Sequence, residues 1–264
     1  MIREFARQVD DVAATDGSGA ALPVAKRDKL AWRVLVPAAG PLAIHYTVYA
    51  HELTVRTSHL DTEHGLLNGT SVLMYPVGHQ GEPGTLALAL PEGWQAYTGL
   101  SPAPSGAPGW FQFSNYDELV DCPIEMGTPA VQRFAVGGIW HEVVVTGAGS
   151  LNLSQLAADR ERLVPQAAQV FRGLPYGRYV VLLTEADRGG GGLEHRNSAV
   201  MMLPRFAPAP TAAERHQRVL HLFAHEFFHA WNIKRLHPDR LGPFDYTREA
   251  YTDNLWLAEG GTDY

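Results

Sequence analysis

The feature that most constrains the fold is a long amphipathic segment near the C-terminal end of the chain. Its apolar residues recur at helical spacing, which places them on one face of a helix. They are Val219, Leu220, Phe223, Phe227 and Ala230. Thr211, followed three residues later by Glu214, has the pattern of a capping box at a helix start. The spacing therefore predicts a helix over residues 212–232, whose apolar face must pack against a second layer.

The first half of the chain has the pattern of β structure. Short segments with alternating or β-branched apolar residues are separated by clusters of Gly, Pro, Asn and Asp. The expected strands lie at residues 30–36, 43–55, 71–77, 86–90, 107–113 and 138–145. This arrangement is typical of an antiparallel β sandwich or an open, barrel-like sheet.

Helical patterns begin in the second half. A helix is expected from about Ser154 to Leu163, Pro165 can open a further helical turn, and another helix should start near Tyr246. Strands are expected at 179–184 and 193–203. We therefore predict an α+β fold, with an N-terminal β-sandwich-like domain over residues 1–148 and a second domain over residues 149–264.

The ends of the chain suggest a piece of a longer protein. The first residues lack a leader-like segment, and the last residue, Tyr264, falls inside a predicted helix. We therefore expect truncation at both ends.

Composition excludes several classes of function. A net charge of -7 argues against a nucleic-acid partner, which normally meets a basic surface. No run of 18 or more apolar residues is present, so the sequence predicts no transmembrane segment. Cys122 is the only cysteine, which rules out a disulfide framework within the chain and makes thiolate ligands for a metal improbable. The oligomeric state does not follow from the sequence.

The predicted helix carries an H-E-x-x-H pattern at residues 225–229. Because residues four apart project from the same helix face, the imidazoles of His225 and His229 can reach one zinc ion. Glu226 falls beside the metal and is placed to accept a proton from a water molecule. The alternative is a helix with two surface histidines, but the flanking aromatic residues indicate that this helix is buried.

A third ligand is expected from an acidic residue further along the chain. Glu259 lies in the apolar stretch 255–260, where a carboxylate is costly to bury unless it is paired or bound to a metal. Asp263, one turn later, can orient a zinc-bound imidazole or be an ordinary exposed carboxylate.

The segment before the zinc helix offers candidates for substrate binding. Gly191 and Gly192 permit a close approach of another backbone, and a peptide could pair with this strand as an added β-strand. Glu194 then faces the substrate's α-ammonium, or else is a surface carboxylate. Two interpretations of His195 remain: it lines the site, or it satisfies a strand edge.

Several other polar residues are assigned to ordinary surface roles. Lys234 and Arg235 form a short basic pair of the kind found on solvated faces. The histidines of the β half are interpreted as surface or locally bonded residues. They include His45, His51, His59, His64 and His79.

The motifs together resemble the M61 peptidases, the glycyl aminopeptidase family of the gluzincin group. HEFFHAWNIKRLHP at 225–238 and LWLAEGGTDY at 255–264 carry the resemblance. GGLEH at 191–195 and DCPIEMG at 121–127 support it, although Cys122 stands where the family usually has Ser. These segments occur in family order over essentially the whole chain.

The resemblance implies an N-terminal β domain followed by the first part of a thermolysin-like catalytic domain. It implies zinc held by His225, His229 and Glu259, a peptide substrate, and aminopeptidase activity with a preference for small N-terminal residues. The residue that stabilises the oxyanion is expected beyond residue 264. Two other functions remain open: a zinc endopeptidase, in which Glu194 binds no amine, and a non-catalytic peptide-binding module. The presence of Glu226 argues against the latter.

Overall fold

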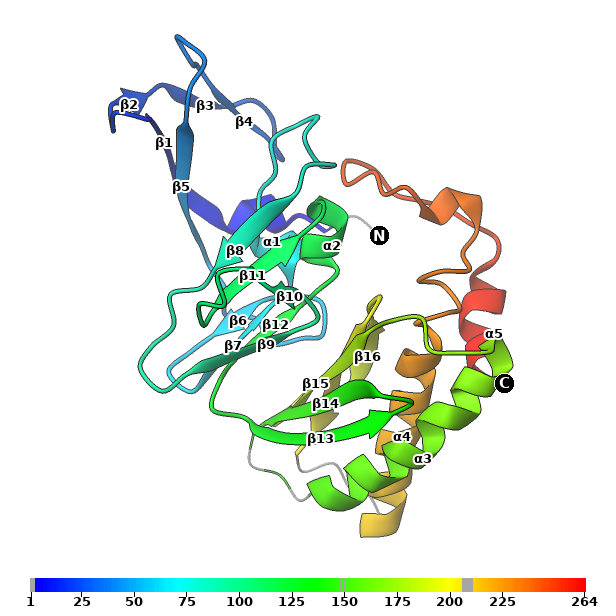
Figure 1. Ribbon diagram of the computed structural model, residues 1–264. Helices are drawn as coiled ribbons and strands as arrows, with labels where there is room; N and C mark the ends of the chain where they lie inside the picture. The colour runs from blue at the N-terminus through cyan, green and yellow to red at the C-terminus, as the bar shows by residue number, and fades with distance from the viewer. Residues whose placement is uncertain (1–2, 148, 150, 206–210) are drawn as a thin grey trace.

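The computed structural model describes residues 3–147, 149, 151–205 and 211–264. The protein has an α+β fold, as the sequence predicted. Small antiparallel sheets form the N-terminal part, and a larger mixed sheet with two long helices forms the rest (Figure 1).

The N-terminal strands pair in the orders β2-β1-β5, β3-β4, β6-β7-β12-β9 and β10-β11-β8. They are β1 (Val9–Asp16), β2 (Ala21–Leu22), β3 (Val24–Lys26), β4 (Trp32–Val34), β5 (Leu42–Val48), β6 (His59–Leu60), β7 (His64–Leu67), β8 (Gly84–Ala87), β9 (Gln95–Thr98), β10 (Ser101–Pro102), β11 (Trp110–Phe113) and β12 (Ile124–Gly127). The short helices among them are η1 (Phe5–Gln8), α1 (Gly69–Val72) and α2 (Tyr116–Val120). The strand expected at 71–77 is absent because Asn68 caps a helical turn there, accepting a hydrogen bond from the Thr70 amide.

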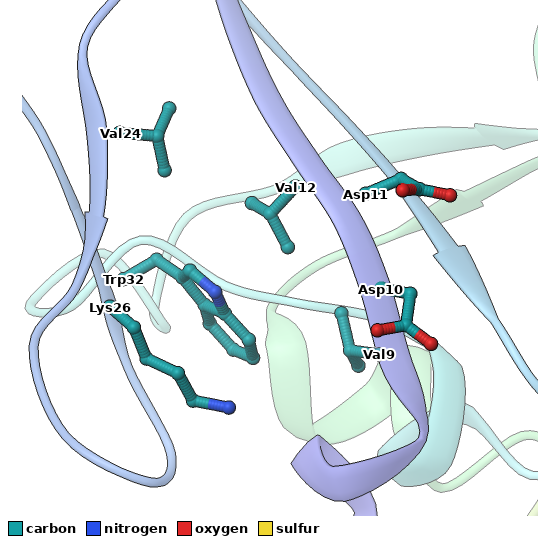
Figure 2. Close-up of a pocket in the computed structure, with 7 residues that line it drawn as sticks. All are labelled: Val9, Asp10, Asp11, Val12, Val24, Lys26 and Trp32. Atoms are coloured by element: carbon teal, nitrogen blue, oxygen red, sulfur yellow. The ribbon is translucent and has the colours of Figure 1, made fainter.

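An open hollow of about 310 Å³ lies among β1, β3 and β4 (Figure 2). Its lining residues are Val9, Asp10, Asp11, Val12, Val24, Lys26 and Trp32. The Lys26 ammonium sits 4.8 Å from the centre of the Trp32 ring. None of the predicted site residues lines this hollow, so it does not belong to the predicted metal centre.

The larger sheet has the strand order β13-β14-β15-β17-β16. Its strands are β13 (Ala130–Val136), β14 (Ile139–Thr146), β15 (Arg178–Ala186), β16 (Gly191–Glu194) and β17 (Ser198–Pro204). The central pairs β14–β15 and β15–β17 are parallel, whereas both edge strands run antiparallel to their neighbours. This sheet begins at residue 130 and so crosses the boundary expected at 148. Because one sheet is not divided between two domains, we propose a boundary between β12 and β13 instead.

Both faces of the larger sheet are buried. On β15, Tyr179, Val181 and Leu183 face the core shared with the long helices. The alternate residues Val180 and Leu182 belong to a second core with Val55 and Leu66 of the N-terminal half. Because side chains alternate along a strand, β15 lies between the two cores and contributes residues to both.

The long helices are α3 (Leu153–Phe171) and α4 (Ala212–Phe228). Thr211 accepts a hydrogen bond from the Glu214 amide, which confirms the predicted cap of α4. In α3, by contrast, Asn152 rather than Ser154 is the cap, and Pro165 lies inside one continuous helix. The strand expected at 193–203 is a hairpin of β16 and β17, turning at residues 195–197.

The helix expected from Tyr246 onward does not form there. Asp245 accepts hydrogen bonds from the amide and hydroxyl of Thr247, which stabilises a local turn instead. After the short turn η2 (Asp239–Leu241), helical structure returns only at the π-helical turn η3 (Trp256–Gly260) and at α5 (Gly261–Asp263). No described helix combines the length and apolar character needed to cross a membrane.

Candidate metal centre

The three predicted ligands converge, although they come from two elements far apart in the sequence. His225 and His229 lie at the C-terminal end of α4, and Glu259 lies on η3. The two imidazole Nε2 atoms are 3.0 Å apart. One oxygen of Glu259, Oε2, lies 3.3 Å from Nε2 of His225 and 3.6 Å from Nε2 of His229.

Hydrogen bonds at the far side of each ring determine which nitrogen carries the proton. His225 Nδ1 lies 2.7 Å from Asp263 Oδ1, and His229 Nδ1 lies 3.0 Å from the carbonyl oxygen of Asn232. A carboxylate and a carbonyl only accept hydrogen bonds, so both Nδ1 atoms must donate. Both Nε2 atoms therefore present lone pairs to each other and to a carboxylate. One metal cation placed between these three acceptors would relieve their mutual repulsion, which a proton on one Nε2 would relieve only in part.

The spacing of these acceptors fits zinc. Ligands bound at about 2.0–2.1 Å in a tetrahedron lie ~3.3 Å from one another. The three observed separations, 3.0, 3.3 and 3.6 Å, bracket that value. Two imidazoles and one carboxylate are also a donor set that zinc commonly uses in catalytic sites, with a fourth position open.

The carboxamide of Asn232 joins the two elements that carry the ligands. Its Nδ2 atom donates to the carbonyl oxygens of Leu257 and Ala258, each at 3.1 Å, and to Thr262 Oγ1 at 2.9 Å. The carbonyl of the same residue holds the His229 ring. Asn232 thus brings the Glu259 turn against the end of α4.

Glu226 lies on α4 between the two histidines and is 4% exposed. Burial, together with the nearby carboxylate of Glu194, raises the pKa of Glu226 to about 7. A bound divalent cation would act in the opposite direction and favour the carboxylate form. The side chain packs so closely against Gly192 that a Cβ atom at that position would overlap the carboxylate group.

Glu194 ends the edge strand β16, which packs over α4. One oxygen of Glu194 lies within 4.8 Å of ligand atoms of both Glu226 and His229. The Glu194 carboxylate therefore lies next to Glu226. The outer edge of β16, the strand that Glu194 ends, pairs with no described strand. Gly191 has φ +105°, a conformation that disfavours any side chain.

His195 occupies a different environment from the one expected of a substrate ligand. The residue is 5% exposed, and its Nδ1 lies 3.1 Å from Asp121 Oδ1. Lys234 Nζ lies 2.7 Å from the same oxygen, and the Arg196 amide donates to Asp121 Oδ2. Burial raises the pKa of Asp121, but the hydrogen bond from His195 and the Lys234 ammonium outweigh it and hold that pKa below its usual range. His195 thus anchors the β16–β17 turn.

The basic pair after α4 is not a solvated face. Lys234 belongs to the Asp121 cluster, and Arg235 donates to the carbonyl oxygens of Pro175, Ala230 and Arg196. Asp121 itself lies in the DCPIEMG segment, whose resemblance to a family motif was the only sequence signal of its importance.

Two family models match the chain: the peptidase M61 N-terminal domain over residues 1–128, and the M61 glycyl aminopeptidase over residues 218–264. The second match contains all three candidate ligands. The chain belongs to the M61 peptidase family.

Solved structures share the fold of this M61 chain. An aminopeptidase N family protein from Idiomarina loihiensis is 33% identical, with a TM-score of 0.91 over 99% of this chain and 46% of that chain. The M61 chain thus spans about half the length of that relative. Weaker similarity extends to an M1 zinc metallopeptidase bound to L-arginine (14% identity, TM-score 0.49) and one from Deinococcus radiodurans (13%, 0.48). In both cases the similar region covers 83% of this chain and 54% of the solved structure's chain. No curated protein matches the sequence.

The geometry predicts which substitutions remove zinc. His225→Ala and Glu259→Ala should each release one zinc equivalent, because each removes one of three converging ligands. His221→Ala is the matched control: His221 lies one turn earlier on α4, its side chain is 73% exposed, and its Nε2 lies 3.9 Å from Asp263 Oδ1. Elemental analysis of the purified intact proteins measures the difference. Equal zinc content in all three variants would contradict the site.

Proposed function

We propose that the intact protein is a zinc-dependent aminopeptidase that uses Glu226 as its general base. The observation that carries the proposal is the convergence of His225, His229 and Glu259, with Glu226 and Glu194 directly beside them. Membership of the M61 family agrees with a metallopeptidase of this kind.

Zinc, when bound by the three ligands, would polarise the scissile carbonyl and lower the pKa of water at the open position. Asp263 and the Asn232 carbonyl keep both imidazoles in the tautomer that binds metal.

Glu226 moves the proton. Its carboxylate accepts a proton from the attacking water and donates it to the nitrogen of the leaving amine. Burial within a pocket formed partly by Gly192 restricts the carboxylate to a small range of positions. General-base catalysis depends on such positioning because proton transfer requires hydrogen-bond contact with the water.

The edge strand β16 would position the substrate. A peptide that pairs with the free edge of β16 would extend past Glu194, whose carboxylate can bind an α-ammonium group. This contact would select peptides with a free N-terminus. The preference for small first residues, such as Gly or Ala, rests on family resemblance alone.

Glu226→Gln tests the assignment of the base. The variant should retain zinc but lose about 10²–10⁴-fold in kcat, because an amide cannot accept the proton. Steady-state kinetics and metal analysis on the same preparation check both parts. A variant with near-normal kcat would show that another group is the base.

Gly192→Ala tests the close packing of Glu226. The added methyl group should displace the carboxylate, and a displacement of about 1 Å can cost about 10²-fold in rate. Gly190→Ala is the matched control, since the nearest atom to its Cβ would be 3.8 Å away. Both variants should fold, as judged by circular dichroism, and only Gly192→Ala should lose kcat/KM. Equal activity of the two would show that the contact is unimportant.

Glu194→Ala tests exopeptidase selectivity. Loss of a charged hydrogen bond to the substrate ammonium, worth about 1.5–3 kcal/mol, should lower kcat/KM for free peptides by about ten- to a hundredfold. The N-acetylated forms of the same peptides should be cut poorly by both proteins. Equal losses on free and acetylated peptides would indicate a structural role for Glu194. Efficient cleavage of acetylated peptides by the unmodified protein would favour an endopeptidase.

A further inference from the structure

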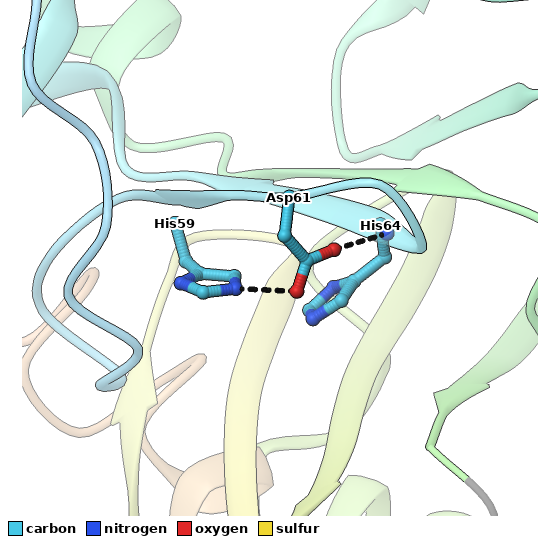
Figure 3. Close-up of side chains that lie close together, drawn as sticks. All are labelled: His59, Asp61 and His64. Atoms are coloured by element: carbon cyan, nitrogen blue, oxygen red, sulfur yellow. Dashed lines mark hydrogen bonds and ion pairs between the residues drawn. The ribbon is translucent and has the colours of Figure 1, made fainter.

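A second group of potential metal ligands lies in the N-terminal half of the chain. His59 on β6 and His64 on β7 flank Asp61 in the turn between these strands (Figure 3). His59 Nε2 is 2.9 Å from Asp61 Oδ2. One nitrogen or oxygen from each of the three residues lies within 4.8 Å of the other two. Both histidines are buried, whereas Asp61 is exposed and leaves one side of the group accessible to solvent.

The turn itself holds Asp61 in place. The other carboxylate oxygen, Oδ1, accepts hydrogen bonds from the amides of Glu63 and His64 at 2.8 and 2.9 Å. These bonds leave Oδ2 directed toward the histidines, as Figure 3 shows. The carboxylate is therefore oriented before any ion binds, which lowers the entropic cost of binding.

An independent observation concerns the far side of the His64 ring. Its Nδ1 lies 3.0 Å from Oε1 of Glu125 on β12, a carboxylate that is 1% exposed. The Thr146 hydroxyl on β14 donates to the same oxygen at 2.6 Å. In the neutral ring, Oε1 accepts a hydrogen bond from Nδ1, and the other nitrogen, Nε2, is left as an acceptor. The His225–Asp263 pair at the candidate zinc centre has the same arrangement, which is typical of metal-binding histidines. Burial lowers the pKa of His64, but the hydrogen bond and negative charge of Glu125 outweigh it and raise that pKa, so a metal ion at Nε2 would compete with a second proton.

Charge gives a further reason for a cation. Asp61 and Glu125 bring two carboxylates to this region, and the only basic side chains that bond either of them within the described residues are the two histidines. The second oxygen of Glu125, Oε2, is buried without a hydrogen-bond partner in the part of the chain that is described. Buried carboxylates are normally compensated by positive charge or by full hydrogen bonding.

We propose that His59, Asp61 and His64 form a second metal site, which binds a divalent transition ion of the zinc type. Two imidazoles and one carboxylate suit such an ion better than calcium or magnesium, which prefer oxygen ligands. The site is structural. The ion joins the β6–β7 turn, through His64 and Glu125, to β12 and to Thr146 of the larger sheet, and so links the two halves of the chain.

The test separates this site from the candidate zinc centre. In the intact protein, His225→Ala and His229→Ala together remove two of the three ligands of that centre. After treatment with a chelator, this double variant is titrated with zinc alone, and bound metal and melting temperature are measured. The expected result is one bound equivalent with a rise in melting temperature, both of which disappear when His64→Gln or Asp61→Asn is added.

His79→Gln added to the double variant is the matched control. His79 forms an imidazole–carboxylate pair with Glu82 at 2.6 Å in the same half of the chain. Both side chains are exposed, and no third potential ligand completes a metal site with them among the described residues. It should leave zinc binding unchanged. Asp61→Asn keeps the buried His64–Glu125 pair intact, so a folding defect of His64→Gln cannot decide the outcome.

Two results would overturn the proposal. One is that the double variant binds no zinc. The other is that the double variant still binds as much zinc after His64→Gln, or after Asp61→Asn, as it does without them. Neither result depends on the proposed peptidase activity. Failure of the zinc centre on α4 would appear separately, as equal zinc content in the unmodified protein and the double variant.

Discussion

The arrangement around α4 depends on two hydrogen bonds made on the far sides of two imidazole rings. Asp263 and the Asn232 carbonyl both accept from Nδ1, which leaves two Nε2 lone pairs 3.0 Å apart beside a carboxylate. Without a cation, these groups would repel one another. Atoms outside the candidate metal site thus fix the orientation of its imidazoles, and the turn containing Glu259 is held in place by the Asn232 side chain.

The helix that carries the two histidines packs on a sheet that is buried on both faces. β15 contributes alternate side chains to the core beneath the helices and to the core shared with the N-terminal half. Each half therefore depends on the other for burial of its apolar surface. The aromatic residues Phe223 and Phe227, both fully buried, position α4 so that its opposite face presents the histidines.

Asp121 connects the end of α4 to the turn that follows Glu194. It binds His195 in the β16–β17 turn and Lys234 in the turn after α4, so one partly buried carboxylate connects the strand that carries Glu194 with the helix that carries the two candidate histidine ligands. In the same segment, Glu125 connects β12 to His64 and Thr146. The resemblance of residues 121–127 to a family motif thus corresponds to two carboxylates, Asp121 and Glu125, each of which bonds to distant parts of the chain.

The sequence by itself determined the α+β class, the capped helix α4, the H-E-x-x-H pattern and the M61 resemblance. These features are readable because they depend on residues close together, through helical spacing and local capping. Tertiary structure alone decided what depends on distant partners. It brought His195 and Lys234 into contact with Asp121, paired His64 with Glu125 61 residues away, and kept α3 continuous through Pro165. It also brought the Glu259 segment against the end of α4, because the Asn232 side chain donates hydrogen bonds to residues 25 and 30 positions further along the chain.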